Sequence, residues 1–297
     1  MRVSSNELQP SRAHAKLMNA SISVIVTHHD RPDVISDAME SVLKQTLRPL
    51  EIILVDDCST PENRAKLNEF AGLATIVDTP ANLGSGGSRN FGARFANGDW
   101  LCFLDDDDLY MPDKLERQVR YLEMHPSVEA LGGALIMESA DGAREHWGAT
   151  DTGKIRLADA LNYTASMSQA LMIKRDLFRD LGGFTPVRHC MDDREFGIRL
   201  VASGREVHFL GEPLFLYRID TRFKRFKWKQ MLSGELTALK MHGELVRHEF
   251  GRLGPVRLRA RCYKKYGLRR GGAVGRSVWA FGSILEAIFG REAGKYR

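Results

Sequence analysis

Paired cysteines and long apolar runs are both missing from this sequence. The four cysteines lie far apart without a C-x-x-C pair, which excludes a zinc ribbon or disulfide framework and favours a reducing compartment. The first 20 residues lack the apolar core of a signal peptide. The best apolar window, SVWAFGSILEAIFG, contains Glu286 and falls short of the ~20 residues that span a bilayer. We therefore expect a cytoplasmic protein, soluble or peripheral on the cytoplasmic face of the inner membrane.

Acidic residues are scarce toward the C-terminus. Residues 221–297 hold 19 lysines and arginines against 5 acidic residues, whereas residues 1–220 carry a net charge of −9. The stretch TRFKRFKWK at 221–229 interleaves aromatic residues with cations. Such charge commonly marks a solvated helical face, but it also suits an anionic membrane, where each cation contributes about 1 kcal/mol. No RNA-recognition motif is present, so we expect no nucleic-acid partner.

Short β-branched runs alternate with helical periodicity through the first half of the chain. Strands are predicted at 21–26, 51–57, 74–78 and 100–104, and helices at 34–43, 62–70, 84–95 and after Pro112. This alternation predicts a parallel sheet covered by helices on both faces. The less regular second half predicts strands at 130–138, 168–174, 206–210 and 213–219, and helices at 176–181 and 193–202.

Acidic motifs follow three of these strands: THHDRP, DDCS and DDDD. One acidic strand end is usually a solvated turn or a helix cap, but ligands of open parallel sheets bind at the carboxyl ends of the strands. Three such ends on one edge therefore indicate a site. Asp105 and Asp107 alternate along a chain expected to be extended, so both carboxylates should face one Mg²⁺ or Mn²⁺ ion. The spacing of an EF-hand calcium loop is absent.

From Ser21 to Tyr217 the sequence resembles the family 2 glycosyltransferases, which have the GT-A fold. The resemblance rests on ordered motifs: SVIVTHHDRP, SVLKQT, EIILVDDCS, NLGSGGSRN, FLDDDDLYMPDKLE, GGF and MDDREFGIRL. It implies an α/β fold, Rossmann-like, with a mostly parallel central sheet and helices on both faces. The expected order is a loose arm (1–20), a catalytic domain (21–220) and a basic helical tail (221–297). Within the domain, 21–110 is the nucleotide-binding half and 111–220 the acceptor half.

The resemblance also implies roles for the nucleotide side of the site. Thr27, His29 and Asp57 match positions that contact the base, and Arg89 matches a basic residue near the nucleotide. The family usually has Tyr-Asn where this chain has His29-Asp30, which leaves the stacking partner and the base open. A surface helix arginine is the other reading of Arg89.

The D-x-D motif of the family falls on Asp105 and Asp107, which implies a Mn²⁺ or Mg²⁺ cofactor. Asp107 is the expected metal ligand, and Asp105 is expected to contact metal or ribose. Asp106 is a further nucleotide-binding candidate through the ribose. Asp108 is expected to cap the turn that leads into the next helix.

The catalytic base of the family is the second acid of an E-D pair that follows G-G-F. Here the pair is Asp192-Asp193, so the resemblance implies that Asp193 is the base, with Asp192 and Glu195 as secondary candidates. Acids in the first turn of a helix are also favoured by the helix dipole, and this reading is compatible with a catalytic role.

The resemblance therefore implies an inverting transferase that moves one sugar from a nucleotide-sugar donor, with a UDP-sugar favoured, to a hydroxyl of a glycan or lipid-linked acceptor. The implied setting is cell-surface polysaccharide biosynthesis. The Q-x-x-R-W motif of the processive synthases is absent. Two alternatives are a sugar nucleotidyltransferase, whose G-x-G-x-R loop is missing after the first strand, and a degenerate GT-A domain acting as a lipid-binding scaffold.

Overall fold

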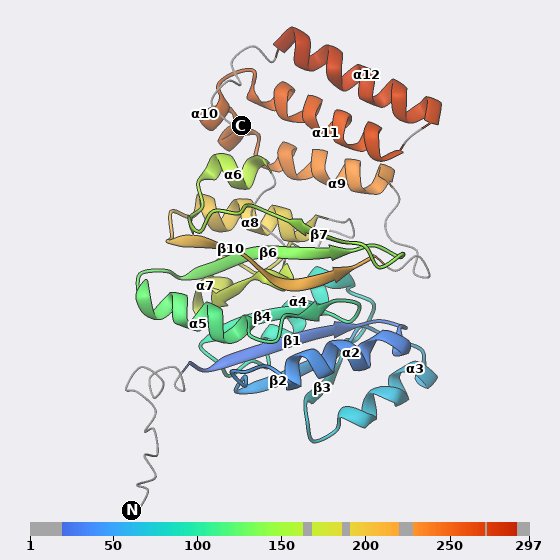
Figure 1. Ribbon diagram of the computed structural model, residues 1–297, viewed down its shortest axis with the longest axis vertical. Helices are drawn as coiled ribbons and strands as arrows, with labels where there is room; N and C mark the ends of the chain where they lie inside the picture. Colours follow the sequence, from blue (N-terminus) through green and yellow to red (C-terminus); the bar gives the residue numbers. More distant parts are fainter. Residues whose placement is uncertain (1–19, 163–167, 186–190, 220–227, 271, 290–297) are drawn as a thin grey trace, which may run out of the picture.

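A ten-stranded sheet forms the centre of the computed structural model, which describes residues 20–162, 168–185, 191–219, 228–270 and 272–289 (Figure 1). Its strands are β1 Ile22–His28, β2 Glu51–Asp56, β3 Thr75–Asp78, β4 Trp100–Asp105, β5 Leu109–Tyr110, β6 Ala130–Glu138, β7 Arg144–Trp147, β8 Gly153–Lys154, β9 Met172–Lys174 and β10 Val207–Arg218.

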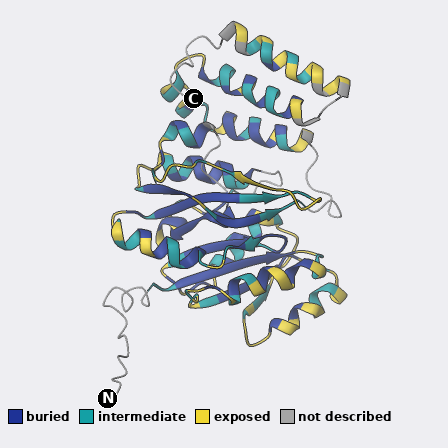
Figure 2. Ribbon diagram, in the orientation of Figure 1, coloured by how far each residue is buried: buried dark blue, intermediate teal, exposed yellow. Residues whose placement is uncertain are grey.

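The main strands of the sheet are parallel. β3, β2, β1 and β4 are neighbours in that order, and β6 and β10 form a second parallel pair. The short strand β9 is antiparallel to both β4 and β6 and joins the two parts. All seven residues of β1 are buried, as expected for a strand covered on both faces (Figure 2). The predicted sheet is therefore confirmed.

Helices cover both faces of the sheet because consecutive strand residues point to opposite sides. On one face, Val24 and Val26 of β1 share a hydrophobic cluster with Ile35 and Leu115 from two covering helices. On the other face, Ile25 belongs to a cluster that includes five buried phenylalanines. The helices of this part are α2 Pro32–Leu43, α3 Pro61–Lys66, α4 Gly84–Ala93, α5 Lys114–Met124, α6 Leu157–Asn162, α7 Arg175–Asp180 and α8 Asp192–Ala202, with 3₁₀-helices η1 Leu67–Phe70 and η2 Ser168–Ala170.

Two predictions in the second half of the chain are wrong in detail. The strand predicted at 168–174 begins as η2, and only the last three residues form β9. The two strands predicted at 206–210 and 213–219 are one strand, β10, whose register shifts on both sides of Pro213. A proline cannot donate a hydrogen bond to the neighbouring strand, so an irregularity at this position lets the strand continue.

Four C-terminal helices stack at one end of the molecule, with the last one outermost (Figure 1). They pack on the sheet domain through a third cluster, in which Leu161 of α6 and Ile198 of α8 contact Leu232, Leu239 and Val246.

In the part of the chain that the structure describes, no helix is both long and apolar enough to cross a membrane. Residues 1–19 of the predicted arm and residues 220–227 of the aromatic and basic stretch lie outside the described residues. The four helices are α9 Trp228–Met241, α10 Gly243–Phe250, α11 Gly254–Arg270 and α12 Gly272–Phe289.

A buried ion pair ties these helices to the sheet domain. Arg194 of α8 pairs with Glu235 of α9, and both side chains are almost fully buried. Arg194 also donates to the carbonyl of Leu161 at 2.8 Å, and the Lys265 ammonium lies 3.5 Å from the Glu235 carboxylate. These contacts with the C-terminal helices fix the orientation of α8.

We expect Glu235→Ala to lower the free energy of unfolding by about 3–5 kcal/mol, because it leaves the Arg194 guanidinium buried without its carboxylate. Urea unfolding followed by circular dichroism measures this loss. Glu212→Ala removes a carboxylate from an exposed pair with Arg117 and is the matched control, with little change expected. Equal stability of the two variants would contradict a structural role for the buried pair.

Candidate functional site

The carboxyl ends of β2, β1 and β4 lie side by side in the sheet, so their acidic ends meet on one edge. The Thr27 hydroxyl, near the end of β1, donates to Oδ1 of Asp105 at the end of β4 over 3.1 Å. Asp30, just after β1, accepts a hydrogen bond from the backbone N–H of Thr60, just after β2, at 2.8 Å. The sequence-based expectation that the three motifs share an edge is confirmed.

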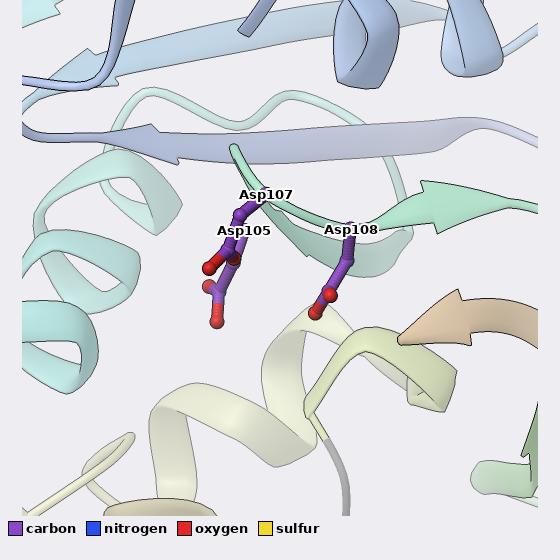
Figure 3. A group of neighbouring side chains, drawn as sticks. All are labelled: Asp105, Asp107 and Asp108. Carbon is purple, nitrogen blue, oxygen red and sulfur yellow. The ribbon is translucent and has the colours of Figure 1, made fainter. Parts of the chain in front are cut away.

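The four aspartates that begin with the last residue of β4 form a turn rather than an extended strand. The backbone N–H of Asp108 donates to the carbonyl of Asp105 at 3.2 Å. The turn brings the carboxylates of Asp105, Asp107 and Asp108 together, with one oxygen from each lying within 4.8 Å of the others (Figure 3). The expected alternation along an extended chain is thus wrong, although Asp105 and Asp107 do come together.

Asp108 lies in this carboxylate group and does not cap the following helix. Its carboxylate accepts hydrogen bonds from the Gln169 side chain at 3.0 Å and from the backbone N–H of Arg218 at 3.1 Å. The residue that precedes α5 is Asp113, and it makes no side-chain cap. Asp108 is therefore not the N-cap of α5, and its carboxylate instead joins the acidic turn to η2 and to the end of β10.

The side chain of Asp106 is fully buried. One carboxylate oxygen lies 2.9 Å from Nδ1 of His28, and the other lies within ion-pairing distance of Arg31. The structure therefore does not place Asp106 with residues that a nucleotide could reach. Its carboxylate holds the loop after β1 against the acidic turn.

Two arginines and one glutamine compensate the acidic turn. Arg89 of α4 donates to both oxygens of Asp105, at 2.6 and 2.8 Å, and Arg31 donates to Asp107 at 2.6 Å. Gln169 of η2 donates to Asp105 at 2.7 Å. Burial would raise the pKa of Asp105, but the Arg89 guanidinium outweighs it and holds that pKa below its usual value.

Arg89 also connects the acidic turn to the start of α8. Its second guanidinium nitrogen lies 3.2 Å from the carboxylate of Asp192, and its side chain is almost fully buried between the two acids. A methyl group on Gly86, one turn earlier in α4, would lie 2.4 Å from the Asp192 carboxylate, so this approach requires glycine. The two acidic motifs predicted as parts of one site are thus neighbours.

Asp193 has an environment that favours its neutral form. Burial, and then the adjacent Asp192 carboxylate, raise the pKa of Asp193 to about 7. Oδ1 of Asp193 accepts a hydrogen bond from the backbone N–H of Arg194 at 2.7 Å. A carboxyl that titrates near neutral pH can accept a proton during a reaction and release it afterwards.

Glu195, the secondary candidate, is held by structural contacts. Its carboxylate accepts hydrogen bonds from Thr185 at 2.5 Å and Arg199 at 2.7 Å, and lies 3.0 Å from Nε2 of His242. Burial would raise the pKa of Glu195, but the His242, Arg199 and Thr185 hydrogen bonds lower it to about 2. A carboxylate this acidic is a weak base, so the geometry does not support Glu195 as a proton acceptor.

Asp57 lies under the glycine-rich segment rather than facing outward. Its buried carboxylate accepts hydrogen bonds from the backbone N–H groups of Leu83 and Gly84 at 2.7 and 2.8 Å, and from the Thr79 hydroxyl at 3.0 Å. Asp57 therefore fixes the start of α4. His29 is exposed on the same edge, and its Nε2 lies 3.2 Å from the side-chain nitrogen of Asn82.

Two contributors to the site, Arg31 and Gln169, are missing from the residues expected from the sequence. Arg31 belongs to the THHDRP motif, and a cation beside three acidic strand ends was a usable signal. Gln169 gave no signal, because its neighbours indicated a strand and only the turn at η2 directs its amide toward the aspartates.

Comparisons with known proteins agree with this arrangement. The family model described as "Glycosyl transferase family 2" matches residues 23–182. An uncharacterized glycosyltransferase of Haemophilus influenzae is 30% identical over 213 residues, which cover 68% of this chain and 69% of the relative. The amylovoran biosynthesis glycosyltransferase AmsE of Erwinia amylovora is 25% identical over 72% of this chain and 82% of its own. The structure of S. aureus TarS 1–349 with UDP-GlcNAc superposes with a TM-score of 0.61, at 16% identity and 93% coverage of both chains.

Proposed function

The chain belongs to glycosyl transferase family 2 and is a glycosyltransferase, and from this premise we propose that it transfers a single sugar, with inversion, from a nucleotide-sugar donor to an acceptor hydroxyl. The observation that carries the proposal is the position of Arg89, which binds Asp105 of the acidic turn and Asp192 at the start of α8. It brings candidate metal ligands and a candidate base to one edge of the sheet. In the proposed transfer, the metal ligands face the diphosphate of the donor and the base faces the hydroxyl of the acceptor, so the two groups must lie close together.

We propose that Asp105, Asp107 and Asp108 hold a divalent cation, Mg²⁺ or Mn²⁺. The donor set fits, because three carboxylates offer hard oxygen ligands within 4.8 Å of one another. When bound, the cation would stabilise the negative charge that develops on the departing nucleoside diphosphate. Arg89 holds Asp105 in place with two hydrogen bonds and so orients one of the three ligands.

Thr27 and His29 are the proposed contacts for the nucleotide, which we take to be a UDP-sugar. Thr27 lies near the end of β1 and His29 directly follows the strand, and the exposed imidazole of His29 offers a ring on which a base can stack. Asp57 supports this side of the site indirectly by holding the backbone of Leu83 and Gly84. The UDP-GlcNAc complex of TarS shares the fold and supports a nucleotide sugar as donor.

Asp193 is the proposed general base, and its pKa is raised by burial and then by the Asp192 carboxylate. The acceptor hydroxyl gives its proton to Asp193 while its oxygen attacks the anomeric carbon from the face opposite the diphosphate. The carbon–oxygen bond to the diphosphate breaks as the new glycosidic bond forms, which inverts the configuration. The Arg194–Glu235 pair and the third hydrophobic cluster hold α8 and position this carboxyl.

A glycan or lipid-linked acceptor in polysaccharide biosynthesis is the proposed setting, supported by the similarity to the amylovoran transferase. We also propose that the basic helices within 221–297 face an anionic membrane. The two alternative functions do not agree with the family assignment, since neither a nucleotidyltransferase nor a scaffold is a glycosyltransferase.

A panel of nucleotide sugars, each with and without Mn²⁺, tests the proposal. A donor that raises the melting temperature in the presence of Mn²⁺ and is then slowly hydrolysed to free sugar and nucleotide would support it. Absence of any donor-dependent stabilisation, from protein that folds cooperatively, would reject nucleotide-sugar binding.

Arg31 is expected to weaken metal binding, because its guanidinium pairs with Asp107 and competes with a cation for that carboxylate. Arg31→Gln should therefore bind Mn²⁺ roughly fivefold more tightly, since about 1 kcal/mol of charge repulsion is removed. Titration of Mn²⁺ followed by electron paramagnetic resonance measures the affinity without any substrate. Arg94→Gln, at the residue just after α4, is the control. Weaker binding by Arg31→Gln than by the parent protein would contradict the prediction.

A further inference from the structure

A groove between α9 and α11 has no role in the proposed transfer chemistry. Its volume is about 530 Å³, and it is lined by Leu232, Leu236 and a ring of polar side chains. The polar residues are three cations, Lys229, Lys240 and Arg259, and three hydroxyl-bearing residues, Ser233, Thr237 and Tyr263. No carboxylate lines the groove among the described residues.

This lining suits a phosphate with an attached apolar chain. Lys240 and Arg259 come from different helices and are both exposed, so they can approach one anion from two sides. Ammonium, guanidinium and hydroxyl groups are the donors that phosphate oxygens accept most strongly. Leu232 and Leu236, one helical turn apart on α9, give the same groove an apolar wall.

An exposed apolar stripe lies next to the groove. Val274, Phe281 and Ile284 of α12 recur at helical spacing on one face, and each is about half exposed. α12 is the outermost helix and carries exposed residues along its length (Figure 2). The Phe281 ring packs edge-on against the ring of Tyr263, which lines the groove, with 5.1 Å between the centroids. The stripe and the groove therefore form one continuous surface.

We propose that this surface binds an anionic membrane lipid, with the phosphate headgroup in the groove and the stripe of α12 among the acyl chains. A helix that lies in the membrane interface has an apolar face next to cations that meet the headgroups. A second copy of this chain is a poorer occupant, because it would bring two strongly basic surfaces of residues 221–297 together. The inference deepens the proposed membrane-facing role and is independent of sugar transfer.

Sedimentation of the full-length protein with vesicles tests the headgroup site. Binding is expected to vesicles that contain phosphatidylglycerol and not to vesicles of phosphatidylcholine alone. The double substitution Lys240→Gln with Arg259→Gln should weaken binding about 30-fold, since each cation near the surface contributes about fivefold. Lys44→Gln with Lys154→Gln removes two exposed cations far from the groove and should bind like the parent protein. Equal binding by both double variants would overturn the groove assignment.

The apolar stripe is tested by Phe281→Ser and Ile284→Ser. Each should weaken vesicle binding while the far-ultraviolet circular dichroism spectrum and the Mn²⁺ and UDP affinities stay unchanged. Vesicle binding equal to that of the parent protein would overturn the role of the stripe. A change from dimer to monomer in analytical ultracentrifugation would assign the stripe to self-association instead. Tight binding of inorganic phosphate without vesicle binding would assign the groove to a soluble anion.

These outcomes are separate from those that test the transferase proposal. Vesicle binding needs no donor, and donor binding needs no vesicle. Failure of the lipid tests with intact UDP-sugar binding would reject only the membrane surface.

Discussion

Asp193→Asn is expected to lower the rate of sugar transfer by at least about a thousandfold, because the amide cannot accept the proton of the attacking hydroxyl. Binding of Mn²⁺ and of UDP should stay within a factor of about two, since no hydrogen bond joins Asp193 to the acidic turn among the described residues. Asp176→Asn, an exposed carboxylate on α7, is the control. Single-turnover transfer and calorimetric titration of UDP measure the two properties separately. Normal turnover by Asp193→Asn would show that another group is the base.

The pH dependence of transfer follows from the raised pKa of Asp193. A base must be ionised to accept a proton, so kcat/KM should be level above pH 7 and fall about tenfold per pH unit below it. Burial is the larger cause of the shift and the Asp192 carboxylate is the second. Asp192→Asn should therefore move the acid limb to lower pH. If the limb stayed in place or moved upward, the two carboxyls would not be coupled as the geometry indicates.

Asp107→Asn is expected to remove the metal dependence of the reaction and to lower the rate by about a hundredfold or more. A bound cation contributes several kcal/mol of charge stabilisation, and each 1.4 kcal/mol corresponds to about tenfold in rate. The substitution leaves the two hydrogen bonds between Asp105 and Arg89 in place, so the other site residues at this edge of the sheet should keep their geometry.

Mn²⁺ titration and the rate at saturating Mn²⁺ check this prediction together. Weak Mn²⁺ binding and slow transfer should occur together in Asp107→Asn, and Asp176→Asn should show neither. Unchanged Mn²⁺ affinity in Asp107→Asn would remove this residue from the metal ligands. Loss of affinity with an unchanged rate would show that the cation does not take part in the chemistry.

Several features of the fold could be predicted from local patterns. The buried run of β1, the strand that ends at Asp105 and the helix that begins at Asp192 are each visible as periodicity and polarity over a few residues. Their alternation determines that the strands are parallel, and parallel strands carry their acidic ends to the same edge. These patterns made Asp105 and Asp107 candidates, whereas Asp193 was implied by the resemblance to family 2 glycosyltransferases.

The different roles of the four aspartates in the acidic turn depend on the tertiary structure. Four consecutive aspartates look alike in sequence, but the turn directs the Asp106 side chain into the protein toward His28 and directs Asp108 toward Gln169. Both partners are far from the turn along the chain. Local propensity carries no information on which distant side chain arrives at a given carboxylate.

What the sequence determined by itself is the α/β class, the edge that carries the site and the excess of positive charge after residue 220. Only the tertiary structure decided that Arg89 bridges Asp105 and Asp192, that Glu195 is held as an ion pair, and that the C-terminal helices pack on α8 through Glu235. The physical reason is the separation along the chain of the residues that determine each property. Periodicity and charge are properties of neighbouring residues, whereas burial, pKa and ion pairing depend on residues that only folding brings together.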